Sequence, residues 1–334
     1  MPRLRKGKGK GKTKTKTISE FDAIELLARE LAARGPGVDL GIGDDAALLG
    51  RIQGKLVLSV DSAVEHTHFE RGWLSPEELG ARALQSAASD LAAMGAAAVA
   101  ALSALVLPAD VGSRELKALG KGQARAAKLL GCVVVGGNIA RGREWSITTT
   151  VIGRADAPIR RRGAQPGDEL WLIGEVGMAA AGLRLLQLGR ARTQKPAFKR
   201  CLAAWRAPHA RLREGRLLAG RASAAIDISD GLAADAGHVA RASNCRLVID
   251  EAALERALAP ELNEVARFLQ LSALEFALSG GEDYALLATG PARKRPVFAR
   301  AIGKVEAGEA IMLQRPTGER VALTGGYDHL ARET

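Results

Sequence analysis

The feature that most constrains this chain is a repeated pattern in which a glycine turn carrying acidic residues stands beside an apolar, strand-like run. It occurs as GIGDDAALL at residues 41–49, as DISDGL at 227–232 and as SGGEDYALL at 279–287. Adjacent carboxylates repel each other, and Mg2+ prefers oxygen ligands and bridges to phosphate. The first segment alone is equally compatible with a solvated turn that caps a helix. The pattern therefore raises a metal hypothesis that the rest of the chain has to support.

Around these turns, apolar strand patterns alternate with helical ones. Strands are predicted at 55–61, 99–107, 132–135, 147–152, 169–173, 225–228 and 247–249, and helices around 21–31, 75–95 and 113–130. The residues 136–142 read as a glycine turn, and the polar stretch 189–200 reads as a loop. Strands that alternate with helices predict an α/β (α+β) fold. A chain of 334 residues is long enough for two domains.

The charge of the chain is concentrated at its start. The formal net charge is +11, and residues 1–17 hold eight basic residues and no acids, so the remainder carries only +3. A segment of this composition cannot bury apolar area and is expected to be disordered. It could attract nucleic acid weakly, or it could be a solubilising tail without a binding role.

Cysteine and hydropathy patterns indicate the compartment. The three cysteines are scattered without a CxxC pair, which argues against a disulfide framework and a zinc site. No run approaches the ~20 apolar residues that a membrane helix needs. The start of the chain also lacks the apolar core of a signal peptide. We therefore expect a cytoplasmic enzyme without a membrane partner.

Two further acids join the turns. Asp61 ends the strand at 55–61, and Asp90 lies in an apolar, small-residue stretch of a helix, where a carboxylate is costly unless it is paired or bound to a metal. The chain contains no GxxxxGK[ST], HRD, DFG, GxSxG or HExxH motif. Many carboxylates beside glycine turns, without a protein nucleophile, suit metal-assisted phosphoryl transfer.

Five motifs in order resemble thiamine-monophosphate kinase, a family of the aminoimidazole-ribonucleotide-synthetase-like superfamily. They are GIGDDAA at 41–47, SDLAAMG at 89–95, DISDGL at 227–232, SGGEDY at 279–284 and GYDH at 326–329. The resemblance covers about residues 19–330. It implies direct, in-line transfer of phosphate from ATP to thiamine monophosphate with several Mg2+ ions, in a homodimer joined through N-terminal domains. Beyond the disordered basic tail at 1–17, which it does not cover, the resemblance implies an ATP/Mg-binding and dimerisation domain at 18–155 and a C-terminal domain at 156–334 that completes the substrate site.

The resemblance also implies roles for individual residues. No residue is expected to act as a covalent nucleophile or general base, because the acceptor phosphate is already ionised near neutral pH. Arg160 or Arg162 could replace Arg161 as the phosphate clamp. Asp44 matches the motif without a clear role. The expected metal ligands are Asp45, Ser59, Val60, Asp61, Asp90, Asp227 and Asp230; the expected ATP contacts are Gly137, Asn138, Arg161 and Ser229; the expected thiamine-phosphate contacts are His68, Glu282 and Tyr327.

The chain departs from the family pattern at three places. Asn138 stands where an acid is common, so one metal ion is expected to bind more weakly. Val60 replaces a hydroxyl residue, which is tolerable if the ligand is a backbone oxygen. Glu65 and His66 stand where a glycine-containing loop is usual. The alternatives are another ATP-using enzyme of the same superfamily, or a weakly catalytic nucleotide-binding homologue with a polyanion-binding tail.

Overall fold

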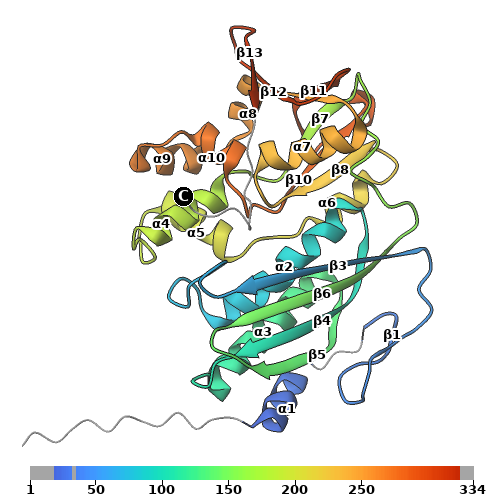
Figure 1. Cartoon of the computed structure of the whole chain (residues 1–334), viewed down its shortest axis with the longest axis vertical. Coiled ribbons are helices and arrows are strands. Elements are labelled where there is room, and N and C mark those ends of the chain that lie inside the picture. The colour runs from blue at the N-terminus through green and yellow to red at the C-terminus, as the bar shows by residue number, and fades with distance from the viewer. Residues whose placement is uncertain (1–18, 32–34, 324–334) are drawn as a thin grey trace, which may run out of the picture.

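The computed structural model describes residues 19–31 and 35–323, which form two sheets with their helices (Figure 1). The first sheet has the strand order β3-β6-β4-β5, and the second has the order β13-β12-β9-β11-β7-β10-β8. A separate pair, β1 and β2, leads into β3. The predicted α/β (α+β) class is confirmed.

The first half of the chain builds the four-stranded sheet. Strands β4 and β5 are parallel, and the other neighbours are antiparallel. Helices α2 and α3 cover one face of this sheet (Figure 1). The elements are α1 (Glu20–Leu31), β1 (Val38–Leu40), β2 (Leu48–Leu49), β3 (Lys55–Val64), α2 (Pro76–Ala93), β4 (Ala97–Leu107), α3 (Ser113–Leu130), β5 (Val133–Arg141) and β6 (Ser146–Ala155).

The second half builds the seven-stranded sheet, in which only β12 and β9 run parallel. Helices α4, α5, α9 and α10 gather at one side, and α7 lies across the strands (Figure 1). The elements are β7 (Glu169–Ile173), α4 (Met178–Gln187), α5 (Pro196–Arg206), α6 (Leu212–Leu218), β8 (Ala224–Ile228), α7 (Leu232–Ser243), β9 (Arg246–Asp250), α8 (Glu251–Ala257), α9 (Pro260–Leu269), α10 (Ala273–Ser279), β10 (Ala285–Gly290), η1 (Ala292–Lys294), β11 (Arg300–Glu306), β12 (Ile311–Gln314) and β13 (Arg320–Leu323).

Helix α2 is the central element between the two sheets. Ser75 caps it, since the Ser75 hydroxyl accepts from the amide of Glu78 and the Glu78 carboxylate accepts from the amide of Ser75. Beyond the cap, α2 is buried along most of its length. Gly215 of α6 packs so closely that a Cβ there would lie 2.0 Å from a carbonyl oxygen of α2. A buried helix that contacts both halves can bring side chains from both sheets together.

Two expected irregular segments are regular in the structure. Residues 136–142 were predicted to be a turn, but 136–141 continue β5, because Gly136 to Arg141 pair in parallel with β4. A Cβ at Gly137 would lie 1.8 Å from the carbonyl oxygen of Ser103, so this close pairing needs glycine. Within 189–200, the helix α5 begins at Pro196, which occupies its first turn. No helix in the described part of the chain is long and apolar enough to cross a membrane.

Candidate functional site

The first component of the site joins the edge strand β3 to α2. The hydroxyl of Ser59 donates a hydrogen bond to Oδ2 of Asp90. Asp90 is partly buried near the end of α2, and Ser59 lies on the face of β3 that turns toward this helix. The costly carboxylate of the apolar helix is therefore paired with a hydroxyl.

Asp227, on strand β8 of the second sheet, lies near Asp90. It ends β8 with only 5% of its surface exposed. Burial, and then the negative charge of Asp90, raise the pKa of Asp227 to about 7, while Arg161 opposes this shift. A carboxylate from helix α2 and one from strand β8 thus repel each other in a buried place, with the guanidinium of Arg161 near them. A divalent cation would relieve that repulsion.

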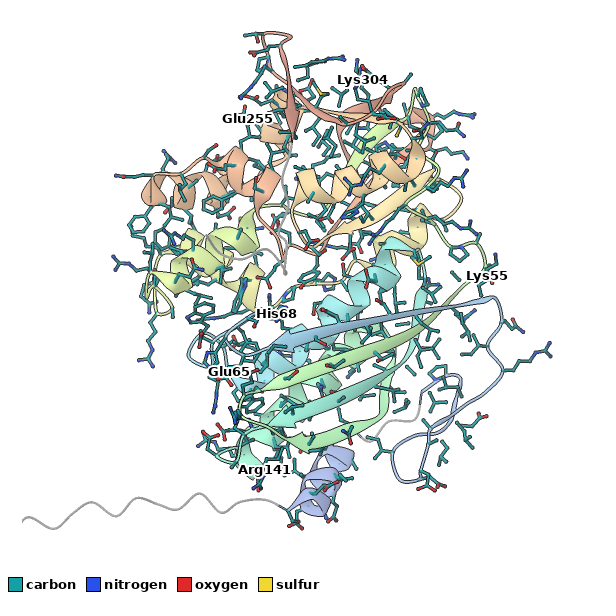
Figure 2. The ribbon with its side chains drawn as sticks, viewed as in Figure 1. Lys55, Glu65, His68, Arg141, Glu255 and Lys304 are labelled. Carbon is teal, nitrogen blue, oxygen red and sulfur yellow. The ribbon has the colours of Figure 1, made fainter. Side chains whose placement is uncertain are left out.

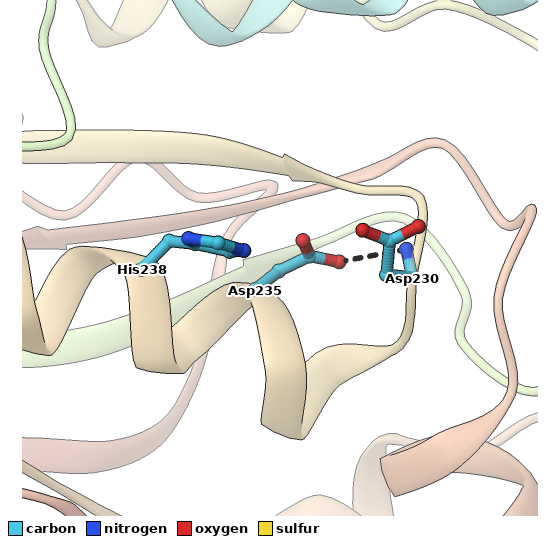
Figure 3. Close-up of side chains that lie close together, drawn as sticks. All are labelled: Asp230, Asp235 and His238. Atoms are coloured by element: carbon cyan, nitrogen blue, oxygen red, sulfur yellow. Dashed lines mark hydrogen bonds between the residues drawn. The ribbon is translucent and has the colours of Figure 1, made fainter. Parts of the chain in front are cut away.

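The turn after Asp227 is held by an acid that the sequence prediction missed. Oδ2 of Asp235 accepts hydrogen bonds from the amides of Ser229, at 3.0 Å, and Asp230, at 3.1 Å. Asp235 is buried, which raises its pKa to about 7. Ligand atoms of Asp230, Asp235 and His238 lie within 4.8 Å of one another and could hold a metal ion (Figure 3).

The third acidic turn is bonded directly to this one. The amide of Glu282 donates to the carbonyl of Ser229 at 2.7 Å, and a Cβ at Gly281 would lie 2.4 Å from that carbonyl oxygen. Asp283 then accepts from the amides of Gly177 and Ala179 and so caps α4. The glycine before the acids is required for this close approach.

Glu282 itself is engaged by protein partners. Its carboxylate accepts from the guanidinium of Arg82 and, at 2.6 Å, from Nε1 of Trp205. Arg82 lies on α2 with 5% of its surface exposed, and its guanidinium stacks over the Trp205 ring at 4.3 Å. This cluster joins α2, α5 and the turn before β10. It is also a place where a substrate group reaching Glu282 would meet a preformed carboxylate.

Asp61 belongs to the same neighbourhood. Burial raises the pKa of the Tyr284 hydroxyl, Arg82 opposes that change, and the charges of Glu282, Asp61 and Asp227 add to it. Ser59 and Asp61 therefore share this region with Asp90, Asp227 and Glu282. We call the carboxylates of Asp61, Asp90, Asp227, Asp230 and Glu282, together with the hydroxyl of Ser59, the interdomain carboxylate cluster.

A second group of predicted residues lines a cavity of about 1180 Å³ beside the first sheet. Asp44 and Asp45 line it together with Gly137 and Asn138, and both aspartates are exposed. The amide of Asp45 donates to Oδ1 of Asp44 at 2.8 Å. The segment at 41–49 thus faces the glycine strand β5 across the cavity.

The remaining predicted residues stand as follows. The Val60 side chain is apolar and 60% exposed, so only its backbone carbonyl could ligate a metal. His68 follows β3, at the end opposite Lys55 (Figure 2), and its Nδ1 accepts from the amide of Val64 at 3.1 Å. Neutral His68 therefore carries its proton on Nε2. Tyr327 and the tail at 1–17 lie outside the described residues.

Comparison with known proteins decides the family. The chain matches the AIR synthase related protein N-terminal domain at residues 43–155 and the C-terminal domain at 165–314. The thiamine-monophosphate kinase of Mycobacterium tuberculosis is 37% identical over 310 residues, covering 89% of this chain and 87% of that protein. The thiamine-monophosphate kinase of Aquifex aeolicus is 33% identical, covering 92% and 97%. This chain belongs to the thiamine-monophosphate kinase family.

Solved structures agree with this family. A structure described as AaThiL complexed with AMPPCP and TMP has a TM-score of 0.78 and 32% identity, covering 93% of this chain and 97% of that one. A thiamine-monophosphate kinase from Stenotrophomonas maltophilia has a TM-score of 0.80 and 31% identity, covering 91% and 98%. A hydrogenase maturation protein in complex with ATP shares the fold, with a TM-score of 0.75 at 20% identity.

In this member of the thiamine-monophosphate kinase family, sequence reasoning missed Arg82 and Asp235. Arg82 could have been found by the argument applied to Asp90, since it is the other charge in the buried part of α2. Asp235 had a weaker signal, an acid in the first turn of a helix that follows a glycine turn. The contact between Arg82 and Glu282, 200 residues apart, has no local signal at all.

Proposed function

We propose that this protein phosphorylates thiamine monophosphate to thiamine diphosphate with ATP, by direct in-line transfer assisted by Mg2+. The proposal rests on the family membership together with one observation. That observation is the meeting of Asp90 from helix α2 with Asp227 from strand β8, in a buried place where their charges oppose each other. Such a pair is stabilised by a cation and not by the protein alone.

The donor set fits Mg2+. The proposed ligands are all oxygens, from carboxylates, a hydroxyl and a backbone carbonyl, and the chain offers no nearby thiolate, since its three cysteines are buried in the apolar cores. When bound, Mg2+ supplies charge neutralisation to the phosphates. The residues proposed to hold it are Asp45, Ser59, Asp61, Asp90, Asp227 and Asp230, with the carbonyl of Val60.

The protein's own groups bind and orient the two phosphates. We assign Gly137, Asn138, Arg161 and Ser229 to ATP. Among the three neighbouring arginines, Arg161 is the one whose charge acts on Asp227 and His238, which favours it as the phosphate clamp. We assign His68, Glu282 and Tyr327 to thiamine monophosphate. No general base is required, because the acceptor phosphate is already ionised.

We also propose a homodimer joined through the first sheet. Leu56, Leu58 and Val60 alternate along the edge strand β3 with 57%, 63% and 60% of their surfaces exposed. An exposed apolar row on an edge strand is a typical association surface. The division into an N-terminal domain at 18–155 and a C-terminal domain at 156–334 is part of the same proposal, as is a cytoplasmic location.

The direct test is conversion of thiamine monophosphate by the purified protein with Mg-ATP, followed by chromatography of the product. We expect thiamine diphosphate in proportion to ADP. Absence of product above background from a folded protein would overturn the proposal. Deleting residues 1–17 separates the kinase from a polyanion-binding role, and we expect the truncated protein to keep its activity.

A further inference from the structure

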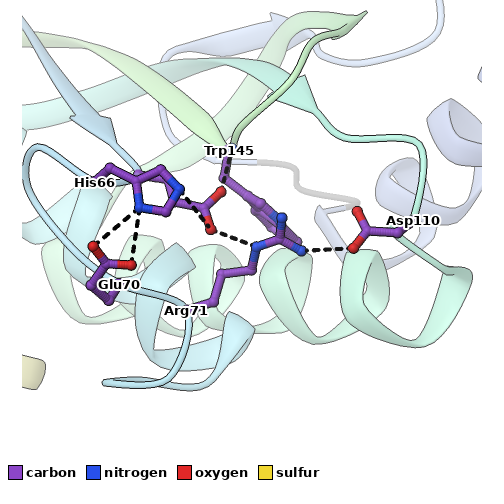
Figure 4. Close-up of polar contacts among 6 residues, drawn as sticks. His66, Glu70, Arg71, Asp110 and Trp145 are labelled. Atoms are coloured by element: carbon purple, nitrogen blue, oxygen red, sulfur yellow. Dashed lines mark hydrogen bonds and ion pairs between the residues drawn. The ribbon is translucent and has the colours of Figure 1, made fainter.

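A buried ionic network lies at the end of β3 and is centred on Glu65, which is followed by His66. The Glu65 side chain is only 4% exposed. Its Oε1 accepts from Nε of Arg71 at 2.6 Å, and its Oε2 accepts from the amide of Trp145 at 2.9 Å (Figure 4). Burial tends to raise the pKa of Glu65, but these hydrogen bonds and the charge of Arg71 outweigh it and lower that pKa. Glu65 is therefore ionised and fully partnered.

The network ties three separate segments together. Arg71 also donates to Oδ2 of Asp110 at 3.0 Å, and Asp110 lies between β4 and α3. Trp145 precedes β6 and is buried. One carboxylate thus connects the loop at 65–71 to the start of β6 and, through Arg71, to the loop after β4.

The loop that is held in this way carries His68. The amide of His68 donates to the carbonyl of Val64 at 2.8 Å, and Nδ1 of His68 accepts from the amide of Val64 at 3.1 Å. His66, two residues earlier, adopts a φ of 67°, a left-handed conformation that favours glycine. The amide of His66 donates to the carbonyl of Phe69 at 2.8 Å. The ring orientation of His68 therefore depends on a tight turn that contains an unfavourable residue.

We propose that Glu65 is a positioning residue that fixes this turn and thereby the orientation of the His68 ring toward thiamine monophosphate. The proposal rests on the proposed function for the identity of the substrate. Glu65 acts through His68 and does not touch the substrate. The ionic network stabilises this turn, and the cost of His66 in the left-handed conformation is offset by these contacts.

The matched test compares Glu65→Gln with Glu70→Gln. Both remove one carboxylate charge from the same loop, but the side chain of Glu70 is 42% exposed, and within the described part of the chain its carboxylate bonds to the exposed ring of His66. We expect Glu65→Gln to raise the KM for thiamine monophosphate by roughly tenfold, while the KM for ATP stays within about twofold. Glu70→Gln is expected to leave both KM values close to wild type. Arg71→Met is expected to reproduce the effect of Glu65→Gln.

A second measurement reports on the His68 ring without an activity assay. Nitrogen-15 NMR of histidine-labelled protein, with His68 assigned through a His68→Gln variant, reports its tautomer. Wild type and Glu70→Gln should show a single Nε2–H tautomer, and Glu65→Gln should show an averaged signal. An unchanged tautomer and an unchanged KM in Glu65→Gln overturn the proposal, as does an equal rise of both KM values. If the wild type does not phosphorylate thiamine monophosphate, the proposed function fails, and the tautomer comparison still decides the role of Glu65.

Discussion

The two aspartate-bearing turns at 41–49 and 227–231 have similar sequences but very different environments. Asp44 and Asp45 are exposed beside a large cavity. Asp227 is buried, and its pKa is raised to about 7 by burial and by Asp90. The comparison shows that the same residue types can serve a ligand in two ways. The exposed turn can approach a ligand at little cost in desolvation. In the buried turn, Asp227 is repelled by Asp90, and a bound cation would relieve that repulsion.

The largest expected effect is at the buried turn. Asp227→Asn should lower kinase activity by roughly a thousandfold, because it removes a proposed Mg2+ ligand from the interdomain carboxylate cluster. The same change should raise the unfolding free energy of the metal-free protein at pH 8 by about 1–4 kcal/mol. The measurements are steady-state kinetics and urea denaturation in EDTA. An active Asp227→Asn enzyme would contradict this account of the buried turn.

The pH dependence of that stability difference has a defined sign. The pKa of Asp227 is about 7 in the folded state and 3.8 as its ordinary value, so between them the folded protein holds a proton that the unfolded chain has released. The contribution of Asp227 to stability therefore falls as the pH rises from about 4 to 7. The advantage of Asp227→Asn over wild type in EDTA should shrink between pH 8 and pH 5. An advantage that grows toward pH 5 would contradict the assignment.

At the exposed turn, we expect a large effect on activity without one on stability. Asp45→Asn should lower activity by roughly a hundredfold at limiting Mg2+ and change the unfolding free energy by less than about 0.5 kcal/mol. Asp39→Asn, at an exposed acid of β1, is the matched control and should behave as wild type. Near-normal kinetics of Asp45→Asn at limiting Mg2+ would remove Asp45 from the proposed ligand set.

Substitution of Arg82 tests the contacts that support the buried turn, because Arg82 holds the carboxylate of Glu282 in the neighbouring turn. Arg82→Met should lower the unfolding free energy by about 3 kcal/mol, because Glu282 then loses its buried cationic partner. Arg200 bridges Glu175 and Glu261 at the surface with 49% of its side chain exposed. Arg200→Met should therefore cost less than about 1 kcal/mol. Equal effects of the two substitutions in urea denaturation would mean that burial does not distinguish these ion pairs.

The smallest expected effect is a gain. Asn138→Asp restores a charge in the cavity opposite Asp45, and it should lower the Mg2+ concentration for half-maximal activity by roughly threefold to tenfold. Asn263→Asp, on the exposed face of α9, adds the same charge elsewhere and should have no effect. An unchanged or weaker Mg2+ response in Asn138→Asp would separate Asn138 from the metal-binding region.

Much of the fold followed from local patterns. The helix α3 at Ser113–Leu130 and the strand β7 at Glu169–Ile173 were predicted with their bounds, because amphipathic spacing and flanking turn residues act locally. The strand at Gly136 and Gly137 was predicted as a turn, since glycine favours turns unless a neighbouring strand approaches closely. That neighbour, β4, is a tertiary feature that the local sequence does not contain.

The candidate site also has a part that the local sequence predicts and a part that only the tertiary structure shows. The carboxylates beside glycine turns could be found from sequence, and so could Asp90, because a charge in an apolar helix needs a partner. The partners of Glu282 and Glu65 could not be found in this way. Arg82 and Glu282 are 200 residues apart, and Glu65 bonds to an amide 80 residues away. The first contact arises where the second half of the chain packs on α2, and the second arises where β3 and β6 pair within the first sheet.

The most direct test of the central claim, that the buried carboxylates are a metal-dependent phosphoryl-transfer site, is thermal unfolding with and without Mg2+ and ATP. It should be run on wild type and Asp227→Asn beside the thiamine monophosphate assay. The account predicts that Mg-ATP raises the Tm of wild type by several degrees, as mass action requires for a ligand of the folded state. Asp227→Asn should show little response and no product. A variant that responds to Mg-ATP as the wild type does, and that makes thiamine diphosphate at the wild-type rate, would contradict it.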